Sequence, residues 1–465
     1  MEIQNQLQAA GLKASLERFW ELSAKKIRLL RDRYDVSSGS PVFTREGKYT
    51  TRGWTEWTQG FQFGGEIIQF DATGEKEFLE TGRDSTLRLM APHITHTGVH
   101  DHGFNNISTY GALRRLIAEG RIDSCMWEKE FYDLALKCTG AVQAMRWTEI
   151  AGGGGFVYSF NGPHSLFVDT IRSMRALAVS HRLGHVLYAE NDRQISLLER
   201  MLKHIESTAK YNVYYGEGRD QYDLNGRTVH EAIFNINDGN FRCPSSQQGF
   251  SPFTTWTRGL AWAMCGFAEQ LEFLETLDDK SIEALGGMAH LDPVMLRAAM
   301  ATCDFYIENT SLDGIPYWDT GAPGLEKLGD HTKVSADPWN DHEPVDSSAA
   351  AIAGQGLLRL GRLLGRRGRE EEGNRYWQAG LTVCRTLLDD PYLSRAEDHQ
   401  GLLLHSVYHR PNGWDHVPPG KKVPCNESSM WGDYHMRELA LYLWRIITDG
   451  PYYTFFAGTG ENHLK

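Results

Sequence analysis

The sequence predicts an all-α protein built as a single (α/α)6 barrel over residues 1–465, with six inner and six outer helices. Two observations predict this fold. Segments with apolar residues at helical spacing and few charges alternate with charged amphipathic segments, and the alternation stops after six rounds. Both ends of the chain are also helical, and the first helix is left over to pair with the last.

The first elements show the two kinds of helix. Residues 3–33 place apolar side chains at helical spacing with charges on the other face, which is typical of an outer helix. Residues 57–70 carry Glu66 as their only charge, so we expect this helix to be buried nearly all round. A glycine turn then leads into a charged helix that runs to about Met90.

The same pair recurs along the rest of the chain. The further inner helices are predicted at residues 102–117, 167–182, 254–271, 346–360 and 431–446. The further outer helices are predicted at residues 127–145, 192–208, 292–308 and 369–388. An open solenoid of helical hairpins uses the same local units, but the stop at six pairs favours a closed ring.

Strand signals are short. Residues 211–215 and 229–234 are rich in β-branched and aromatic side chains, and we expect them to form hairpins on the rim. The glycine run at 152–155 predicts a flexible rim loop. It does not indicate a phosphate cradle, because no strand precedes it and no GK[ST] follows.

The composition excludes several classes of function. A net charge of −12 argues against binding to nucleic acid, whereas a small anionic substrate held by one or two local cations remains allowed. The seven cysteines are widely spaced without a CxxC pair, which predicts reduced thiols. The N-terminus has no signal-peptide pattern and no apolar run reaches membrane-spanning length. We therefore expect a cytoplasmic protein that binds no membrane.

Polar and aromatic residues recur near the starts of the predicted inner helices, where they would converge on one rim of the barrel. They are Trp57, Asp101, Asp169, Trp256, Arg258, Asp346 and Trp431. A single aspartate at a helix start is most simply a cap, and Asp346, followed by two serines, is interpreted in that way. Asp101 has bulky aromatic neighbours in HDHGF and Asp169 follows the apolar run LFV. Burial of both carboxyl groups is expected to raise their pKa values, which suits a general acid.

Two further groups of residues bear on the site. His93, His96, His100 and His102 crowd around Asp101, but their spacing fits no common metal signature, and we predict hydrogen bonding and packing for them. In the segment 248–262, Trp256 could stack on a sugar ring and Arg258 could pair with a carboxylate. Core packing of Trp256 and Trp262 is an equally good interpretation from the sequence alone.

Six segments resemble, in the same order, the unsaturated glucuronyl hydrolases of glycoside hydrolase family 88. They are HDHGF (100–104), LFVDTIRS (166–173), QGFSPFTTWTRGLAWAMCGFA (248–268), IPYWDTGAP (315–323), DSSAAAIAGQGLLRLG (346–361) and WGDYHMRELAL (431–441). The resemblance extends from about Trp54 to Leu441. It implies an (α/α)6 barrel, in agreement with the helix pattern.

The resemblance also implies a reaction. The substrate would be a small anionic oligosaccharide left by a polysaccharide lyase, with a 4,5-unsaturated uronic acid at its non-reducing end. An aspartic acid would protonate C4 of the enol ether and water would add at C5, after which the hemiketal opens and releases the remaining sugar. No cofactor and no metal are implied.

The family's functional residues match named positions of this chain. Asp169 would be the general acid and base, and Asp101 would hold the ring and tune the pKa of Asp169. The resemblance implies contacts to the sugar from Trp57, His230, Gln248, Trp256, Arg258, Trp262 and Tyr408.

The chain departs from the family pattern after Asp169. Ser173 stands where asparagine is frequent, and Arg172 stands where an apolar residue is usual. Because these changes would lie near the leaving sugar, an extra arginine could meet a sulfate or a second carboxylate there. Three alternatives remain at this point, namely a hydrolase of unsaturated galacturonyl units from pectin, a sugar epimerase on the same barrel and a sugar-binding protein without catalysis. The sequence leaves the aglycone and the oligomeric state open.

Overall fold

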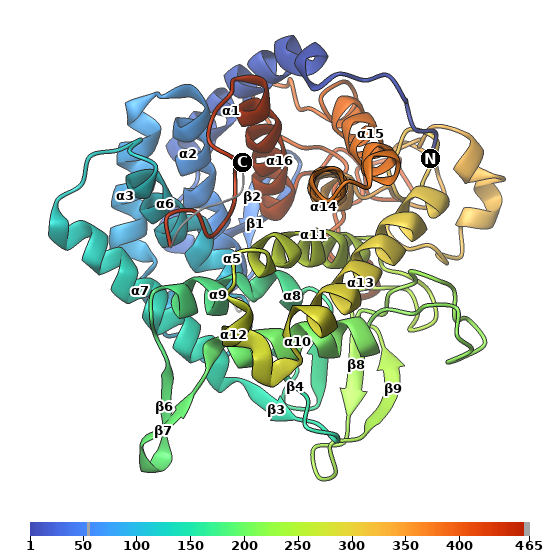
Figure 1. Ribbon diagram of the computed structural model, residues 1–465. Coiled ribbons are helices and arrows are strands. Elements are labelled where there is room, and N and C mark those ends of the chain that lie inside the picture. The colour runs from blue at the N-terminus through green and yellow to red at the C-terminus, as the bar shows by residue number, and fades with distance from the viewer. Residues whose placement is uncertain (54–55, 460–465) are drawn as a thin grey trace.

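Six inner helical segments form a closed ring in the computed structural model, which describes residues 1–53 and 56–459 (Figure 1). The inner segments are α2 (Gln59–Thr73), α5 (His102–Asn106) with α6 (Ala112–Ala118), α8 (Thr170–Ser173) with α9 (Arg175–Arg182), α11 (Thr257–Leu274), α14 (Ser347–Arg366) and α16 (Met430–Ile447). Each segment contacts the next, and α16 contacts α2. The predicted (α/α)6 barrel is therefore confirmed, and the open solenoid is excluded. Trp54, where the family resemblance begins, lies outside the described residues.

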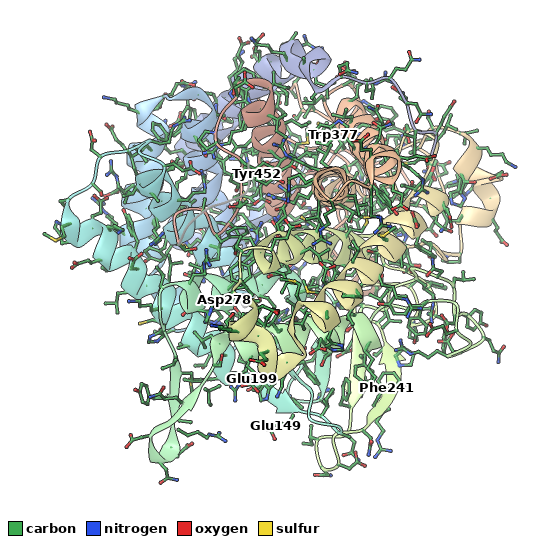
Figure 2. All side chains as sticks on the ribbon, viewed as in Figure 1. Glu149, Glu199, Phe241, Asp278, Trp377 and Tyr452 are labelled. Atoms are coloured by element: carbon green, nitrogen blue, oxygen red, sulfur yellow. The ribbon has the colours of Figure 1, made fainter. Side chains whose placement is uncertain are left out.

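The outer helices cover this ring. They are α1 (Lys13–Arg33), α3 (Lys76–Leu89), α7 (Met126–Met145), α10 (Leu197–Tyr211), α13 (Gly287–Asn309) and α15 (Glu370–Leu387), with the short helices α4 (Ala91–Ile94) and α12 (Asp279–Ile282) between them. As predicted, α1 packs against α16, so the two ends of the chain complete the last pair (Figure 1). Side chains fill the spaces between the ribbons (Figure 2). No helix among the described residues is long and apolar enough to cross a membrane.

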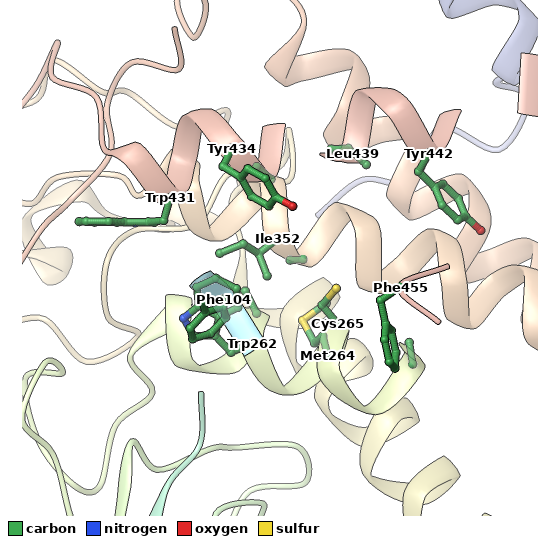
Figure 3. Packing of buried hydrophobic residues seen from close by; sticks show 14 of the residues in the cluster. Phe104, Trp262, Met264, Cys265, Ile352, Trp431, Tyr434, Leu439, Tyr442 and Phe455 are labelled. Atoms are coloured by element: carbon green, nitrogen blue, oxygen red, sulfur yellow. The ribbon is translucent and has the colours of Figure 1, made fainter. Parts of the chain in front are cut away.

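The inner helices pack closely because their sequences allow it. Every residue of α11 is buried, and Gly356 of α14 lies so close to α11 that a Cβ there would be 2.8 Å from the backbone nitrogen of Cys265. Large side chains from α11, α16 and α5 then meet inside the ring, where Phe104 contacts Trp262 with ring centroids 5.0 Å apart (Figure 3).

Short strands form small sheets in the loops between the helices. They are the hairpins β1 (Pro41–Arg45) with β2 (Lys48–Thr51), β3 (Trp147–Glu149) with β4 (Gly155–Val157) and β6 (Leu187–Ala189) with β7 (Arg193–Ile195), and the sheet of β5 (Ser165–Phe167), β8 (Glu231–Phe234) and β9 (Phe241–Ser245) in the order β5-β8-β9. The predicted strand at 229–234 is confirmed in part as β8. The stretch 211–215 contributes only the bridge between Val213 and Thr228. Gly152, Gly153 and Gly154 lie in the loop between β3 and β4, and Gly155 begins β4. The expectation that no strand precedes the glycine run is therefore wrong, because β3 ends three residues before it.

Five predicted helix starts are wrong by three residues or more. The helix predicted from residue 254 begins at Thr257, and the one predicted from residue 292 begins earlier, at Gly287. The first outer helix begins at Lys13, after a 3-10 turn, and not at residue 3. The helix predicted from residue 167 begins at Thr170, because residues 165–167 pair with β8. The helix predicted from residue 192 begins at Leu197, where the Ser196 side chain accepts a hydrogen bond from the backbone N–H of Glu199. This S-x-x-E pattern is a capping signal that the periodicity did not reveal.

Candidate active site

A cavity with about 720 Å³ of space not filled by atoms lies where the starts of the inner helices converge. Eight of the nine predicted site residues line it, namely Trp57, Asp101, Asp169, Gln248, Trp256, Arg258, Trp262 and Tyr408. The ninth, His230, is fully buried, with its Nε2 3.6 Å from Oδ1 of Asp169. These nine residues therefore lie in or beside one cavity, and their contacts with a substrate stay a prediction.

The two aspartates meet because their helices touch. A Cβ on Gly103 of HDHGF would lie 2.4 Å from the backbone oxygen of Ser173, so only glycine fits at this crossing. The Ser173 hydroxyl accepts a hydrogen bond from the N–H of Gly103 (2.9 Å) and donates one to the carbonyl oxygen of His100 (2.5 Å). Ser173, one of the departures from the family pattern, thus joins the two segments that carry Asp101 and Asp169.

Neither aspartate acts as a helix cap. Asp101 precedes α5 and Asp169 precedes α8, but neither side chain accepts a capping hydrogen bond. The strand β5 leads directly into Asp169 and fixes its position. Asp101 is 7% exposed and Asp169 is 8% exposed, and both residues line the cavity. The capping interpretation is therefore excluded for this pair.

Two histidines contact Asp169. Nε2 of His100 lies 3.1 Å from Oδ2 of Asp169 and 3.9 Å from Oδ1 of Asp101, so this ring bridges the two carboxyl groups. On the other side, Nδ1 of His230 accepts hydrogen bonds from the N–H groups of Gln247 (3.0 Å) and Gln248 (3.3 Å). A neutral His230 therefore carries its proton on Nε2, which points toward Asp169.

The pKa values of the two aspartates are displaced in opposite directions. Burial raises the pKa of Asp101, and the nearby charge of Asp169 adds to this effect, while His100 opposes it. Burial also acts to raise the pKa of Asp169, but hydrogen bonding to His100 and then to His230 outweighs it and leaves that pKa well below its usual value. The expected rise is confirmed for Asp101 and is wrong for Asp169, because the sequence did not reveal two histidine partners.

His100 is displaced in the complementary direction. Burial lowers its pKa, but the charge of Asp101 and the hydrogen bond to Asp169 outweigh burial, so the net pKa is raised. Phe167 packs edge-on against His100, with centroids 5.6 Å apart, and lies 4.2 Å from the ring of His230. His100, Asp101 and Asp169 therefore all have displaced pKa values, and Phe167 packs against the ring that bridges the two carboxyl groups.

Aromatic rings form one wall of the cavity. Trp57 and Tyr408 line the cavity and pack against the buried Trp431 behind them, with ring centroids 5.0 Å and 5.3 Å from it. Trp256 lies 4.8 Å from the ring of His230. Flat aromatic faces of this kind suit the apolar faces of sugar rings.

Arg258 lines the cavity and is also bonded within the protein. Its guanidinium donates hydrogen bonds to Asp346 (2.9 Å), to Gln248 Oε1 (3.0 Å) and to the carbonyl oxygens of Val407 and Tyr408. All four bonds come from the two terminal nitrogens of the guanidinium. Arg258 therefore positions Gln248 and the Tyr408 loop. Asp346 caps α14 through the N–H groups of Ser348 and Ala349, as predicted.

Arg172 lies away from any leaving sugar. Its side chain is fully buried and donates hydrogen bonds to Glu269 (3.0 Å) and Glu438 (2.6 Å), which also pair with Arg175. The expectation that Arg172 meets a sulfate or carboxylate of the substrate is wrong, because the partners come from α11 and α16.

The other histidines of the HDHGF region serve the fold. His93 bonds to Gln59 (2.8 Å) and Asn105 (3.1 Å), and His102 bonds to Thr139 (2.6 Å). Among the described residues, His100, Asp101 and Asp169 bring ligand atoms within 4.8 Å of one another, a set that could hold a divalent cation. A cation there would have to replace the bond between His100 and Asp169.

Several lining residues were not singled out from the sequence. They are Val99, Phe104, Phe160, Phe167, Gln247, His409 and Trp414. Trp414 carried the best signal, because an exposed polar loop after Asn412 and Gly413 has little use for a tryptophan unless it contacts a ligand or another ring. In the structure it lies 5.3 Å from Tyr408.

The chain resembles known enzymes along most of its length, although no family model matches it. It is 23% identical over 442 residues to the unsaturated glucuronyl hydrolase of Bacillus sp. (strain GL1), covering 92% of this chain and 95% of that protein. It is 22% identical to the unsaturated chondroitin disaccharide hydrolase of Streptococcus pyogenes serotype M1, covering 91% and 90% of the two chains. The relationship to unsaturated glucuronyl hydrolases is confirmed.

The solved structure of the unsaturated glucuronyl hydrolase from Bacillus sp. GL1 has the same fold. It superposes with a TM-score of 0.68 at 20% sequence identity, covering 92% of this chain and 98% of that chain. The chain thus has the fold of that structure over most of its length.

Proposed function

We propose that the protein is a glycoside hydrolase that releases a 4,5-unsaturated uronic acid from the non-reducing end of small anionic oligosaccharides made by polysaccharide lyases. The observation that carries this proposal is the pair of buried carboxyl groups, Asp101 and Asp169, bridged by His100 in a cavity with an aromatic wall. Two carboxyl groups with separated pKa values in one cavity are suited to giving and taking protons at one carbon centre.

The proposed reaction hydrates the enol ether of the unsaturated ring. Protonated Asp169 gives its proton to C4, and positive charge develops at C5 and the ring oxygen. Water attacks C5 and gives a proton back to the Asp169 carboxylate. The hemiketal at C5 then opens to a ketone, and the hemiacetal left at C1 releases the remaining sugar as an alcohol. One water molecule is consumed and Asp169 is regenerated.

Asp169 must gain a proton before this reaction, because its pKa in the free protein lies below the usual value. Two features favour protonation of Asp169. The substrate carries its own carboxylate, and a second negative charge in the buried cavity disfavours ionised Asp169 and raises its pKa. His100 lies 3.1 Å from Asp169 and can transfer a proton to it without changing the net charge of the cluster.

Asp101 has the complementary role. Its raised pKa favours the protonated form, which can donate a hydrogen bond to a hydroxyl group of the ring. Trp57, Trp256 and Trp262 would enclose the ring, and Gln248, held by Arg258, would offer an amide to its polar groups.

The test is loss of ultraviolet absorbance. The double bond of the unsaturated uronate is conjugated with its carboxylate, and hydration destroys this chromophore. We expect absorbance to fall when the protein is incubated with lyase digests of heparin, chondroitin, gellan or ulvan. A digest of pectin, with unsaturated galacturonyl ends, separates the two hydrolase specificities. No loss on any of the digests would refute the proposal.

A further inference from the structure

A second pocket adjoins the proposed active site. It is an open pocket with about 1110 Å³ of space not filled by atoms, including solvent at its mouth, between the β1–β2 hairpin and the loop that follows Tyr408. Tyr408 and Trp414 line both this outer pocket and the active-site cavity, so the two spaces are neighbours that share one aromatic wall. Trp57, Trp431, Tyr408 and Trp414 then form a continuous row of rings, with successive centroids 5.0, 5.3 and 5.3 Å apart.

The outer pocket carries positive charge in an acidic protein. Arg45 and Arg52 line it, although the chain as a whole has a net charge of −12. The lining carboxylate Asp415 is half-buried, and its oxygens accept hydrogen bonds from the N–H groups of Tyr408 (2.5 Å) and His409 (3.1 Å). With Arg45 and Arg52 against this one aspartate, the lining of the pocket carries a net positive charge.

Arg52 lies against the aromatic row. Its guanidinium carbon is 4.1 Å from the ring centre of Trp414 and 5.6 Å from that of Tyr408. An arginine stacked on a ring keeps its N–H groups in the plane of the guanidinium, a geometry that matches carboxylate and sulfate oxygens. An aromatic face next to a planar cation is the combination that a negatively substituted sugar needs.

Hydrogen bonds tie the β1–β2 hairpin, which carries Arg45 and is followed by Arg52, to the segment before α16. Glu427 accepts hydrogen bonds at the tip of the hairpin from the N–H groups of Glu46 (2.8 Å) and Gly47 (3.2 Å). The backbone of Thr44 also donates to Ser428 (2.8 Å), just before α16. A pocket held in place before the ligand arrives loses less entropy on binding.

We propose that this outer pocket binds the leaving part of the oligosaccharide and selects for a negative substituent on it, held by Arg52 and Arg45 with a sugar ring on Trp414. The inference rests on the proposed hydrolase function and adds the class of preferred substrate. The shared chemistry is an oxyanion, which a sulfate ester or a uronate carboxylate can supply.

Three unsaturated chondroitin substrates separate the two sources. The unsulfated disaccharide has a neutral leaving sugar, the 6-sulfated disaccharide adds a sulfate, and the unsulfated tetrasaccharide adds a carboxylate one sugar further out. We expect a lower KM for at least one anionic substrate than for the neutral disaccharide. In Arg52→Gln, we expect the KM ratio of neutral to anionic substrate to fall about tenfold, with a smaller fall in Arg45→Gln. Arg18→Gln, an exposed arginine on α1, is the matched control.

Each outcome supports or overturns the inference. A tenfold fall in the KM ratio of neutral to anionic substrate in Arg52→Gln supports the inference. The anionic substrate that shows the fall tells whether the pocket prefers a sulfate or a carboxylate. Unchanged ratios in both variants, or equal losses on the neutral and the anionic substrates, overturn it. If the wild-type protein cleaves none of the three, the proposed function fails on chondroitin and the pocket is judged by calorimetry with N-acetylgalactosamine 6-sulfate and with glucuronate. Binding of either that is weakened in Arg52→Gln retains the site, and no binding overturns it.

Discussion

Two buried clusters of charged residues lie within one helical turn of each other and behave differently. Asp169 belongs to the cluster at the cavity, and Arg172, three residues later, belongs to a network deeper in the ring. In that network Arg172, Arg175 and Arg359 face Glu269, Glu272 and Glu438, so the charges balance. At the cavity two carboxyl groups face two histidines, and the charge depends on where the protons are.

The difference shows which kind of burial indicates function. Paired charges inside the ring are fixed because arginine does not lose its proton near neutral pH. The cavity cluster, by contrast, holds groups whose pKa values are displaced in both directions and that border an open space. Burial and charge are common to both clusters, whereas exchangeable protons beside a cavity distinguish the cluster that contains Asp169.

The largest expected effect is on turnover. In Asp169→Asn we expect the rate of absorbance loss to fall by about 10² to 10⁴, because the amide cannot give a proton to C4. The thermal unfolding midpoint should stay near that of the wild type. Asp84→Asn, on the exposed face of α3, is the control. Wild-type activity in Asp169→Asn would remove this residue from its proposed role.

A loss of stability is expected from the deeper network. Arg172→Met leaves Glu269 and Glu438 short of one cation in the ring interior, which we expect to lower the free energy of unfolding by about 3–5 kcal/mol. Denaturant unfolding followed by circular dichroism measures this change. Unchanged stability together with a loss of turnover on sulfated substrates would instead support a contact between Arg172 and the substrate.

The pH dependence of stability separates the clusters further. The pKa of His100 is raised on folding, so its contribution is complete below the unfolded value of about 6.5 and is lost as pH rises through the folded pKa. The difference in unfolding free energy between the wild type and His100→Gln should therefore shrink as pH rises above about 6.5, by about 1.4 kcal/mol for each tenfold gain in proton affinity on folding. Because arginine does not titrate there, the difference for Arg172→Met should stay constant. Urea unfolding at stepped pH measures both, and parallel curves would contradict the distinction.

The smallest effect is expected from metal removal. His100 and Asp169 already bond to each other at 3.1 Å, so we expect turnover to be the same before and after dialysis against a chelator. Zinc or manganese added back is the control. Activity that disappears with the chelator and returns with a metal would assign the His100, Asp101 and Asp169 set to a cation.

Local patterns explain what was predicted correctly. The alternation of apolar and amphipathic helices depends on side chains three and four residues apart, which the sequence displays directly. The starts of α8 and α10 were predicted too early. Residues 165–167 pair with a strand before α8, and the capping Ser196 sets the start of α10, whereas the apolar pattern extends further toward the N-terminus in both segments. The predicted site residues agree with the residues that line the cavity because the six motifs that carry most of them keep their order along the chain.

Periodicity and the order of the motifs are enough to establish the barrel and the approach of Asp101 and Asp169 to one rim. The partners of each charge depend on how the ring closes. Arg172 pairs with Glu438, 266 residues away, and Arg258 reaches the Val407 and Tyr408 carbonyl oxygens about 150 residues away. His100 and His230 set the pKa of Asp169 from two different segments. A charged group responds to whatever lies within a few ångströms, and ring closure brings distant segments that close.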